Sequence, residues 1–342
     1  MGQITIKHVA MRSGFSNATV SRVLGGSSYP VNEKTRKKIL QCAEELGYTP
    51  NLLARSLKKN ISDEVAVVIP SLENPFYALL VKGIEKELSH NGFNTLIYAY
   101  DGSESTSKIS DLLLGKRTAG IIFSGNHLSE EIIDRLKRQQ NNLTPVIAVN
   151  FIQKEADIFS GIFFNYHECG KMTAEYLIKN GHLNTAWAIH NMNPDAWMDL
   201  KNGFCEKYQN AGCSFDSSSI FNSDIAGDFD AGCELAEKII ASSKPYTAIS
   251  TNNDLVALGI LHTLYHHHIS VPEDISLISA GDITSSQMAI PSLTTIHIPA
   301  EKMGNLAASL ISKNQFEKGK IFRIYLEPSL IEHETVKNIS QS

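Results

Sequence analysis

The chain has 342 residues, of which 42% are hydrophobic and 20% charged, a composition typical of globular proteins with sizeable cores. This length predicts two or three domains. The formal net charge of −5 hides an asymmetry, because residues 1–60 contain ten Lys or Arg and three acidic residues, whereas the remainder contains 21 and 33. A basic N-terminal segment on an acidic body is typical of a protein that meets a polyanion at one end only.

Three signals favour a cytoplasmic protein without a membrane partner. The N-terminal stretch MGQITIKHVAMRSG lacks the apolar run of a signal peptide. No segment approaches the ~18 apolar residues that span a bilayer. The five cysteines are odd in number and form no C-x-x-C pair, which favours buried free thiols in a reducing compartment.

The first fifty residues predict three short helices. Thr5 can cap the first helix, which Gly14 ends, and Ser16 can cap the second. The third begins at Asn32 and ends at Gly47. Two helices joined by a tight turn form a helix-turn-helix, which places its second helix in the major groove of DNA.

The stretch SNATVSRVL, residues 16–24, divides into two faces when it is wound as a helix. The apolar face, which needs burial, consists of Val20, Val23 and Leu24. On the other face Arg22 can bond guanine, Asn17 suits adenine, and the Ala18 methyl can contact a thymine methyl. Hydroxyls that can bind phosphates come from Ser16, Thr19 and Ser21. The alternative is a small three-helix cap with a solvated polar face.

Residues 51–60, NLLARSLKKN, follow Pro50 and can form about two helical turns. One alternative is an ordinary interdomain linker, but a solvated linker does not need the apolar residues Leu53, Ala54 and Leu57. A minor-groove binder inserts such an apolar wedge and places basic residues on phosphates. The basic residues available here are Arg55, Lys58 and Lys59.

Two long segments, ITIKHVAMRSGFSNATVSRVLGG and VNEKTRKKILQCAEELGYTPNLLARSLK, resemble the DNA-binding head and hinge of the LacI/GalR repressor family. The resemblance covers residues 4–59, with GGSSYP as a departure from many relatives. It implies a homodimer on a near-palindromic DNA operator, a hinge that folds as helix only when paired on DNA, and Leu57 in the minor groove. The expected DNA-binding residues are Thr5, Ser16, Asn17, Ala18, Thr19, Ser21, Arg22, Asn51, Ala54, Arg55, Leu57 and Lys58.

From Glu64 onward, apolar strands alternate with helices, which predicts an α/β fold of doubly wound parallel sheets behind the all-α helix-turn-helix domain. Two similar Rossmann-like subdomains in succession predict a ligand cleft between the carboxyl ends of their strands. The expected segments are 1–48 for the helix-turn-helix domain, 49–61 for the hinge and 62–342 for the effector-binding core. Within the core, the N-subdomain is expected at 62–162 and 294–322, and the C-subdomain at 163–293 and 323–340.

Enzyme motifs are missing from the sequence. No two glycines are spaced as G-x-G, and Gly120 and Gly125 have P-loop spacing but are followed by Asn126 where Lys is required. Neither G-x-S-x-G nor H-E-x-x-H occurs. In HTLYHHH, His262 and His266 share a helical face that could bind a metal, but a solvated helix end facing the helix dipole is favoured. We therefore expect no catalysis, no metal and no cofactor.

The segments IPSLENPFYALLVKGIEKELSHNGF, TNNDLVALGIL and VPEDISLIS…PSLTTIHIP resemble the periplasmic-binding-protein-like core of the same family. By family position, the effector cleft includes Ser71, Phe76, Tyr77, Ser124, Asn150, Phe151, Trp197 and Asn253. Three polar anchors of the family depart from the pattern. The usual Asp falls on Phe164, the usual Arg falls on Leu200, and SAGD replaces G-[FY]-D, with Gly281 at the Asp position and Asp282 one residue later. Phe164, Leu200 and Asp282 complete the expected cleft.

These departures allow two interpretations. Aromatic rings can line a cleft for a neutral sugar or glycoside, or the cleft has lost its sugar and a partner protein regulates the chain. The missing Arg disfavours a phosphate ligand. The tail EHETVKNISQS lacks the leucine heptads of a tetramerisation helix.

The expected function is a homodimeric repressor of carbohydrate-utilisation genes whose effector changes the angle between the subdomains. Two rival classes are weaker. A solute-binding protein for sugar uptake would need a signal peptide and no basic head. A sugar-processing enzyme would need paired carboxylates or a phosphate-binding loop.

Overall fold

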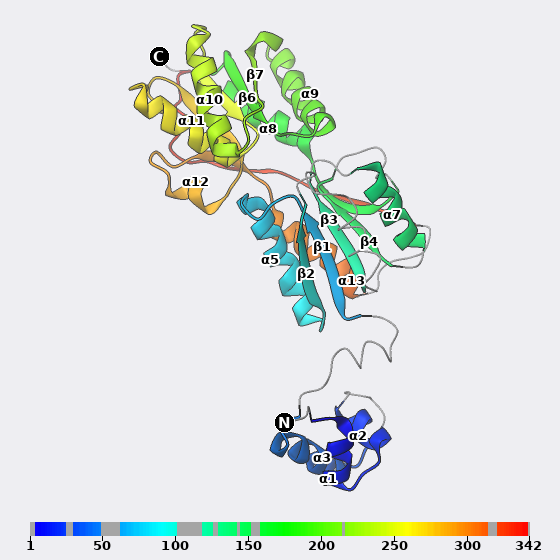
Figure 1. Ribbon diagram of the computed structural model, residues 1–342. Helices are drawn as coiled ribbons and strands as arrows, with labels where there is room; N and C mark the ends of the chain where they lie inside the picture. Colours follow the sequence, from blue (N-terminus) through cyan, green and yellow to red (C-terminus); the bar gives the residue numbers. More distant parts are fainter. Residues whose placement is uncertain are drawn as a thin grey trace. The chain divides into compact units, whose positions relative to one another are not determined.

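The computed structural model describes residues 4–24, 30–48, 62–100, 118–125, 129–141, 144–151, 158–213, 216–313 and 320–340. The chain forms two compact units, Met1–Ser62 and Asp63–Ser342 (Figure 1). The expected hinge contacts lie outside the described residues, and these are Asn51, Ala54, Arg55, Leu57 and Lys58. Among the described helices, none has both the length and the apolarity that a bilayer crossing requires.

The described part of the first unit consists of the helices α1 (Ile6–Ser13), α2 (Asn17–Leu24) and α3 (Glu33–Glu45). Val9, Val20 and Ile39 contribute one fully buried or nearly fully buried side chain from each helix to a small shared core. Gly14 ends α1 in the left-handed conformation at φ 77°, which L-residues rarely adopt. The three-helix arrangement predicted from helical spacing is therefore confirmed.

Two parallel sheets form the second unit. The first consists of β1 (Glu64–Ile69), β2 (Asn94–Ala99), β3 (Gly120–Ser124), β4 (Val146–Val149), β5 (Ser160–Phe164) and β11 (Arg323–Leu326). The second consists of β6 (Thr185–His190), β7 (Ile220–Ser223), β8 (Ala248–Thr251), β9 (Ser276–Gly281), β10 (Thr294–His297) and β12 (Ser329–Ile331). Their strand orders are β11-β5-β4-β3-β1-β2 and β12-β10-β9-β8-β6-β7, and β10–β12 is the antiparallel pair among the described strands. The expected α/β architecture is confirmed.

Helices cover both faces of each sheet. Around the first sheet lie α5 (Pro75–His90), α7 (Glu130–Asn141) and α13 (Ala300–Ser312). Around the second lie α8 (Tyr166–Lys179), α9 (Pro194–Asn210), α10 (Asp228–Ala241), α11 (Asp254–His266), the short α12 (Thr284–Met288) and a single 3₁₀ turn at Ser217–Ser219. Along β1, Val65 and Val67 pack with α5 and α13, whereas Ala66 and Val68 pack with α7, as the two-residue period of a strand requires.

Helices α5 and α13 pack against each other at backbone distance (Figure 1). A Cβ on Gly83 would collide with the carbonyl oxygen of Glu301, and a Cβ on Gly304 would collide with that of Leu80. Any larger residue at these two positions would force the helices apart. The close contact makes this side of the first sheet one rigid layer.

The chain crosses between the sheets three times, after β5, β10 and β11. Strand β10 pairs with β9 in the second sheet, and β11 pairs with β5 in the first. The second and third crossings therefore follow residues 297 and 326, whereas the sequence-based boundaries put them at 294 and 323. Both strands are short, and their local pattern does not reveal which sheet they join.

Candidate functional site

The expected DNA-reading residues share the exposed face of α2. Asn17, Ala18 and Arg22 are exposed, whereas Val20 and Val23 on the opposite side are buried. This division is the one that the helical spacing predicts.

Two of the expected phosphate-binding hydroxyls lie at the start of α2, where Ser16 caps the helix. The Ser16 and Thr19 hydroxyls lie 2.9 Å apart, and the Thr19 N–H donates to Ser16 Oγ at 3.2 Å. Ser21 on the same helix is half-buried, and Thr5 stands exposed at the start of α1. Exposed basic side chains of this unit include Lys34, Lys37 and Lys38 on α3. Hydroxyls, helix starts and lysines are the groups that contact phosphates in protein–DNA complexes.

The expected effector residues all follow the carboxyl ends of strands, where parallel α/β folds bind ligands. Those in the first half of the cleft are Ser71, Phe76, Tyr77, Ser124, Asn150, Phe151 and Phe164, and those in the second half are Trp197, Leu200, Asn253 and Asp282.

Aromatic side chains gather on the first half of the cleft. The rings of Phe76 and Tyr77 meet edge to face with centroids 5.2 Å apart. Asn150 donates to the Tyr166 hydroxyl at 2.8 Å and accepts from the Phe164 N–H at 3.3 Å. Burial raises the pKa of Tyr166 to about 12, so its hydroxyl stays protonated at neutral pH. Asn150 thus ties the ends of β4 and β5 together and fixes the Tyr166 ring.

Three of the expected effector residues lie in the hydrophobic core. Phe151, Phe164 and Leu200 are 2%, 1% and 3% exposed, respectively. Phe151 packs edge to face on Phe123 at 5.0 Å. These side chains can shape the walls of the cleft from behind, but they offer little surface to a ligand.

The departure at Gly281 has a steric cause. A Cβ on this residue would lie 2.8 Å from Oδ2 of the buried Asp254. Asp254 is held by neutral donors that include the Ile283 N–H at 2.9 Å and the Ser286 hydroxyl at 2.7 Å. A side chain at position 281 would therefore crowd this buried carboxylate, and an acid there would place two like charges close together.

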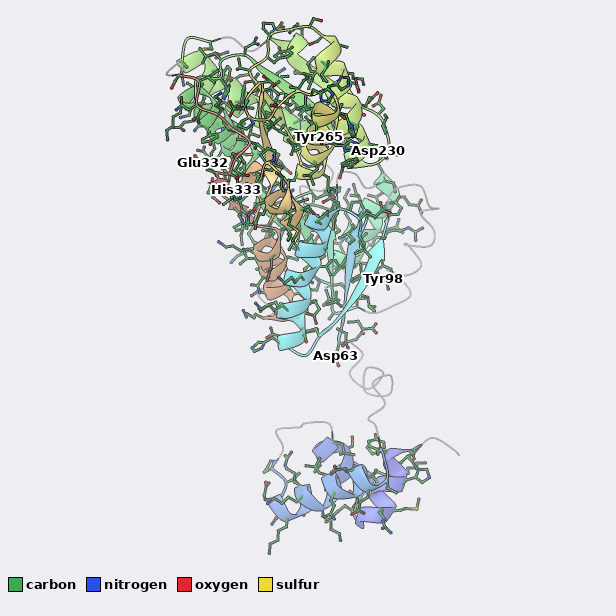
Figure 2. The ribbon with its side chains drawn as sticks, turned by 90° about the vertical axis from the view of Figure 1, so that its left-hand side faces the viewer. Asp63, Tyr98, Asp230, Tyr265, Glu332 and His333 are labelled. Carbon is green, nitrogen blue, oxygen red and sulfur yellow. The ribbon has the colours of Figure 1, made fainter. Side chains whose placement is uncertain are left out.

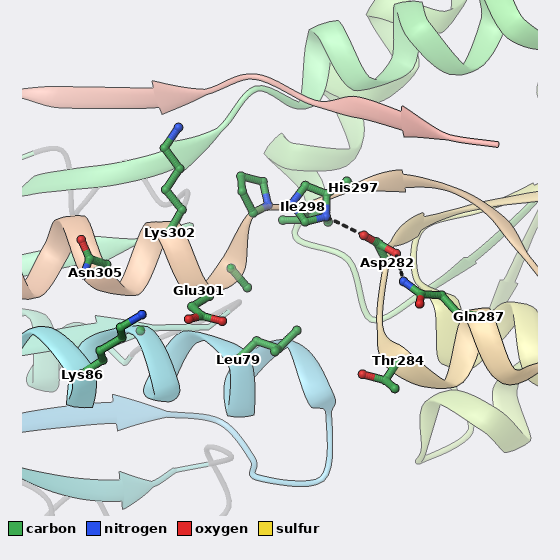
Figure 3. A pocket seen from close by; sticks show the side chains of 13 residues that line it. Leu79, Lys86, Asp282, Thr284, Gln287, His297, Ile298, Glu301, Lys302 and Asn305 are labelled. Atoms are coloured by element: carbon green, nitrogen blue, oxygen red, sulfur yellow. Dashed lines mark hydrogen bonds and ion pairs between the residues drawn. The ribbon is translucent and has the colours of Figure 1, made fainter.

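Asp282 lines a pocket that contains none of the other expected effector residues. The pocket has a volume of about 550 Å³ and lies between α5, the start of α13 and the loop after β9 (Figure 3). The Asp282 carboxylate is 2.9 Å from His297 Nδ1 and accepts from Gln287 Nε2 at 3.2 Å. This pocket adjoins the crossing between the sheets that follows β10.

Three polar residues that sequence reasoning missed join the strand ends of the two sheets, where the cleft is expected. Asn74, which caps α5, donates to Oδ2 of Asp228 at 2.9 Å. The other carboxylate oxygen of Asp228 lies 3.5 Å from Nε2 of His190. We call Asn74, His190 and Asp228 the cross-cleft cluster. From sequence alone, each has an ordinary structural role. Asn74 caps a helix, His190 ends a strand, and Asp228 is an acid in the first turn of a helix. Only the tertiary fold joins them.

Two buried hydroxyls at strand ends have no partner among the described residues. They are Ser124 Oγ at the end of β3 and Thr251 Oγ1 at the end of β8. Buried polar atoms are nearly always paired in folded proteins, and each exception calls for an explanation, such as a bound water, an ion or a functional role. Both strand ends belong to the edge of the sheets where the fold places a ligand.

The comparisons with known proteins agree with this architecture. Residues 5–51 match the model of the bacterial regulatory proteins of the lacI family, and residues 62–327 match that of the periplasmic binding proteins and sugar-binding domain of the LacI family. Catabolite control protein A of Priestia megaterium is 31% identical over 312 residues, which cover 91% of this chain and 92% of that protein. The transcriptional repressor PurR of Vibrio vulnificus (strain CMCP6) is 30% identical over 98% of this chain and 99% of its own length.

Among solved structures, the lac repressor dimer bound to operator and the anti-inducer ONPF is similar with a TM-score of 0.83 at 24% identity. The alignment covers 98% of this chain and 100% of that one. The curated relatives are transcription regulators rather than enzymes. With both family models matched and the two-part fold in place, this chain belongs to the LacI family of DNA-binding transcription regulators.

Proposed function

We propose that this protein represses carbohydrate-utilisation genes as a homodimer on a near-palindromic operator, under the control of a neutral sugar or glycoside bound in the cleft. The observation that carries the proposal is the pairing of an exposed reading face on α2 with an aromatic-lined cleft in the core. A regulator that contacts DNA acts where the DNA is, which supports the cytoplasm as its location.

In the proposed complex, Arg22 bonds a guanine, Asn17 an adenine, and Ala18 contacts a thymine methyl. The capped start of α2 and the hydroxyls around it fix the helix on the phosphates. Arg22 is exposed and lies one turn beyond Ala18 on the same helix, which supports a shared role in base contact.

Exposed apolar side chains on the second half of the core support the homodimer. Tyr265 on α11 is 76% exposed (Figure 2), and Met288 and Ile290 after β9 are 75% and 97% exposed. Phe229 on α10 is 42% exposed and lies 5.5 Å from the ring of His262. Single apolar side chains on a surface are ordinary, but several on neighbouring elements favour an interface. A second copy of the chain is the occupant we propose, since the operator is expected to be two-fold.

The cleft supports a neutral effector through its side chains. The described residues assigned to it include the half-buried rings of Phe76, Tyr77 and Trp197, and no Lys or Arg. Rings offer flat apolar surfaces for a sugar, whereas a phosphate would need a cationic partner. Binding there would change the angle between the subdomains through its differential affinity for two arrangements.

Footprinting tests the DNA-binding part of the proposal. The full-length protein is incubated with DNA from upstream of its own gene and digested with DNase I. We expect protection of a near-palindrome, and loss of that protection for the variant Asn17→Ala. A wild-type protein that leaves every segment unprotected at micromolar concentration would contradict the proposal.

The dimer and the effector have separate tests. Sedimentation at micromolar concentration should give a dimer, and Ile290→Asp should shift it toward monomer. A thermal-shift panel of mono- and disaccharides, aryl glycosides and their phosphates should stabilise the protein only with neutral members. At a hundred times the dissociation constant, the expected stabilisation is about 2.7 kcal/mol. Silence across the panel would favour control by a partner protein instead.

A further inference from the structure

The polar anchor of the cleft lies where the family pattern does not place it. The three positions of the family's usual anchors hold Phe164, Leu200 and Gly281, of which the first two are core residues and the third abuts Asp254. The cross-cleft cluster instead brings a carboxylate, an imidazole and a carboxamide to the same cleft.

Asp228 is the charged centre of this cluster. It is the first residue of α10, and its side chain is 16% exposed. Proximity to this carboxylate is one cause, after burial and Tyr166, of the raised pKa of Tyr77. The Asp228 carboxylate therefore lies near Tyr77, on the side of the expected cleft where the Phe76 and Tyr77 rings meet. An ionised carboxylate only accepts hydrogen bonds and has about four acceptor directions, of which Asn74 occupies one. His190 Nε2 lies 3.5 Å from the other oxygen and donates to it only in the imidazolium form.

His190 is held so that its ring orients Asp228. Its Nδ1 lies 3.2 Å from the carbonyl oxygen of Ser223, which can only accept, so Nδ1 carries the proton in that bond. Its backbone N–H and carbonyl both bond the side-chain amide of Asn252, at 3.0 and 2.8 Å. The ring is 8% exposed and points its Nε2 at Oδ1 of Asp228.

Asn74 fixes the other carboxylate oxygen from the opposite side of the cleft. Its Oδ1 accepts from the Phe76 N–H at 3.0 Å, and its Nδ2 donates to Oδ2 of Asp228 at 2.9 Å. The cap of α5 therefore defines which amide atom faces the carboxylate. As a result side chains from both halves of the core, Asn74 and His190, hold Asp228 in place.

We propose that Asp228 is the specificity-determining anchor of the effector and accepts hydrogen bonds from the hydroxyls of a neutral polyhydroxyl ligand. Asn74 and His190 are its positioning residues. A buried acceptor rejects phosphates and carboxylates by charge and selects ligands that donate. The proposal rests on the proposed function, because it assigns the anchor of the same effector site.

Isothermal titration of the full-length protein tests the anchor. The probes are glucose, galactose, ribose, maltose and cellobiose, together with glucose 6-phosphate. The variants are Asp228→Asn, which keeps the shape but loses the charge, and the matched control Asp230→Asn, an exposed acid two residues along α10. For a sugar that binds the wild type, we expect Asp228→Asn to weaken binding about 10- to 100-fold, the range of a hydrogen bond to a charged group, and Asp230→Asn to leave it unchanged.

A ligand cycle and a rescue sharpen this test. One monodeoxy analogue of the bound sugar should bind the wild type more weakly than the sugar itself does. Asp228→Asn should bind that analogue and the sugar with nearly equal affinity. His190→Ala should weaken binding, and His190→Gln, which restores an N–H donor, should recover most of it. A merely structural role for His190 would give no such recovery.

The outcomes separate the anchor from the proposed function. A neutral sugar that binds the wild type and Asp228→Asn within threefold of each other would overturn the anchor and leave the proposed function standing. Tighter binding of glucose 6-phosphate than of glucose would overturn the donor-only ligand class. Binding of none of the probes would overturn both the proposed sugar effector and its anchor. Selective loss in Asp228→Asn, with Asp230→Asn unchanged, would establish the anchor.

Discussion

The two units of this protein distribute their functional residues in opposite ways. On α2 the proposed reading face lies within six consecutive residues, Asn17 to Arg22, whose helical spacing alone separates exposed from buried side chains. In the core, the Asn74–Asp228 hydrogen bond joins residues 154 positions apart. The first unit therefore exposes its function in a short motif, whereas the second assembles its function from strand ends. A substitution in the first acts on one contact, and one in the second acts on the fold as well.

The largest expected effect comes from restoring a family anchor in the core. Leu200→Arg would put a positive charge at a position whose side chain is only 3% exposed. We expect the free energy of unfolding to fall by about 3–5 kcal/mol, as for other uncompensated buried charges. Urea denaturation measures this change, with Lys201→Arg on the neighbouring position as the control. A stability loss below about 1 kcal/mol would mean that position 200 can reach the cleft.

The next largest effect is a loss of affinity for DNA, without a change in the stability of the protein. Arg22→Ala should cost roughly 1–3 kcal/mol of operator affinity per half-site and relax specificity at one base pair. Anisotropy titrations on the operator and on single-base variants measure both quantities. Arg12→Ala on α1, which removes an exposed arginine that lies 3.9 Å from Glu45, is the matched control for charge. Uniform weakening on all sequences, with a smaller salt slope, would make Arg22 a phosphate contact instead.

A pair of buried serines compares an unpartnered hydroxyl with a bonded one. Ser286→Ala removes a hydroxyl that donates to Asp254 at 2.7 Å and should destabilise the protein by about 1–3 kcal/mol. Ser124→Ala removes a buried hydroxyl without a partner among the described residues, so we expect no loss or a gain of up to about 1 kcal/mol. Thermal unfolding of both variants measures the difference. Equal losses would show that the Ser124 hydroxyl has a partner in the folded protein.

The smallest effect is a pH dependence in the core. Burial lowers the pKa of His182, whose ring is 1% exposed and contacts the Lys337 carbonyl at 2.8 Å and Thr247 at 3.1 Å. The unfolded chain then binds a proton more readily than the folded one, so stability decreases as the pH falls below the ordinary histidine value of about 6.5. His182→Gln should flatten this part of the stability curve between pH 7 and pH 5. A steeper curve in the variant would reverse the sign we assign.

Helical spacing and capping predict the three described helices of the first unit. Thr5, Gly14 and Asn32 mark helix boundaries through chemistry that acts within four residues. In the core, the alternation of strands and helices predicts the sheets, and the strand ends predict where the cleft lies. These features depend on local sequence, so the sequence carries them.

Burial and pairing over long distances escape such reasoning. Whether Leu200 faces the cleft or the core depends on how α9 packs on α8, where Gly170 abuts the Leu200 backbone. The sheet that β10 joins depends on pairing with β9, not on its own residues. His190 and Asp228 become functional candidates only when β6 and α10 are placed side by side. Such contacts are set by the whole fold.

The three crossings between the sheets also bear on how such proteins can be recombined. The head precedes residue 63 in one continuous stretch, so a single junction in a gene suffices to exchange it for another DNA-reading unit. Each half of the core is assembled from separate stretches, since β10 returns to the second sheet and β11 to the first. Exchanging one half would need three junctions at once, each of them between the two sheets. A change of DNA-binding specificity can therefore come from exchange of the head alone, whereas the two halves of the core have to be exchanged together.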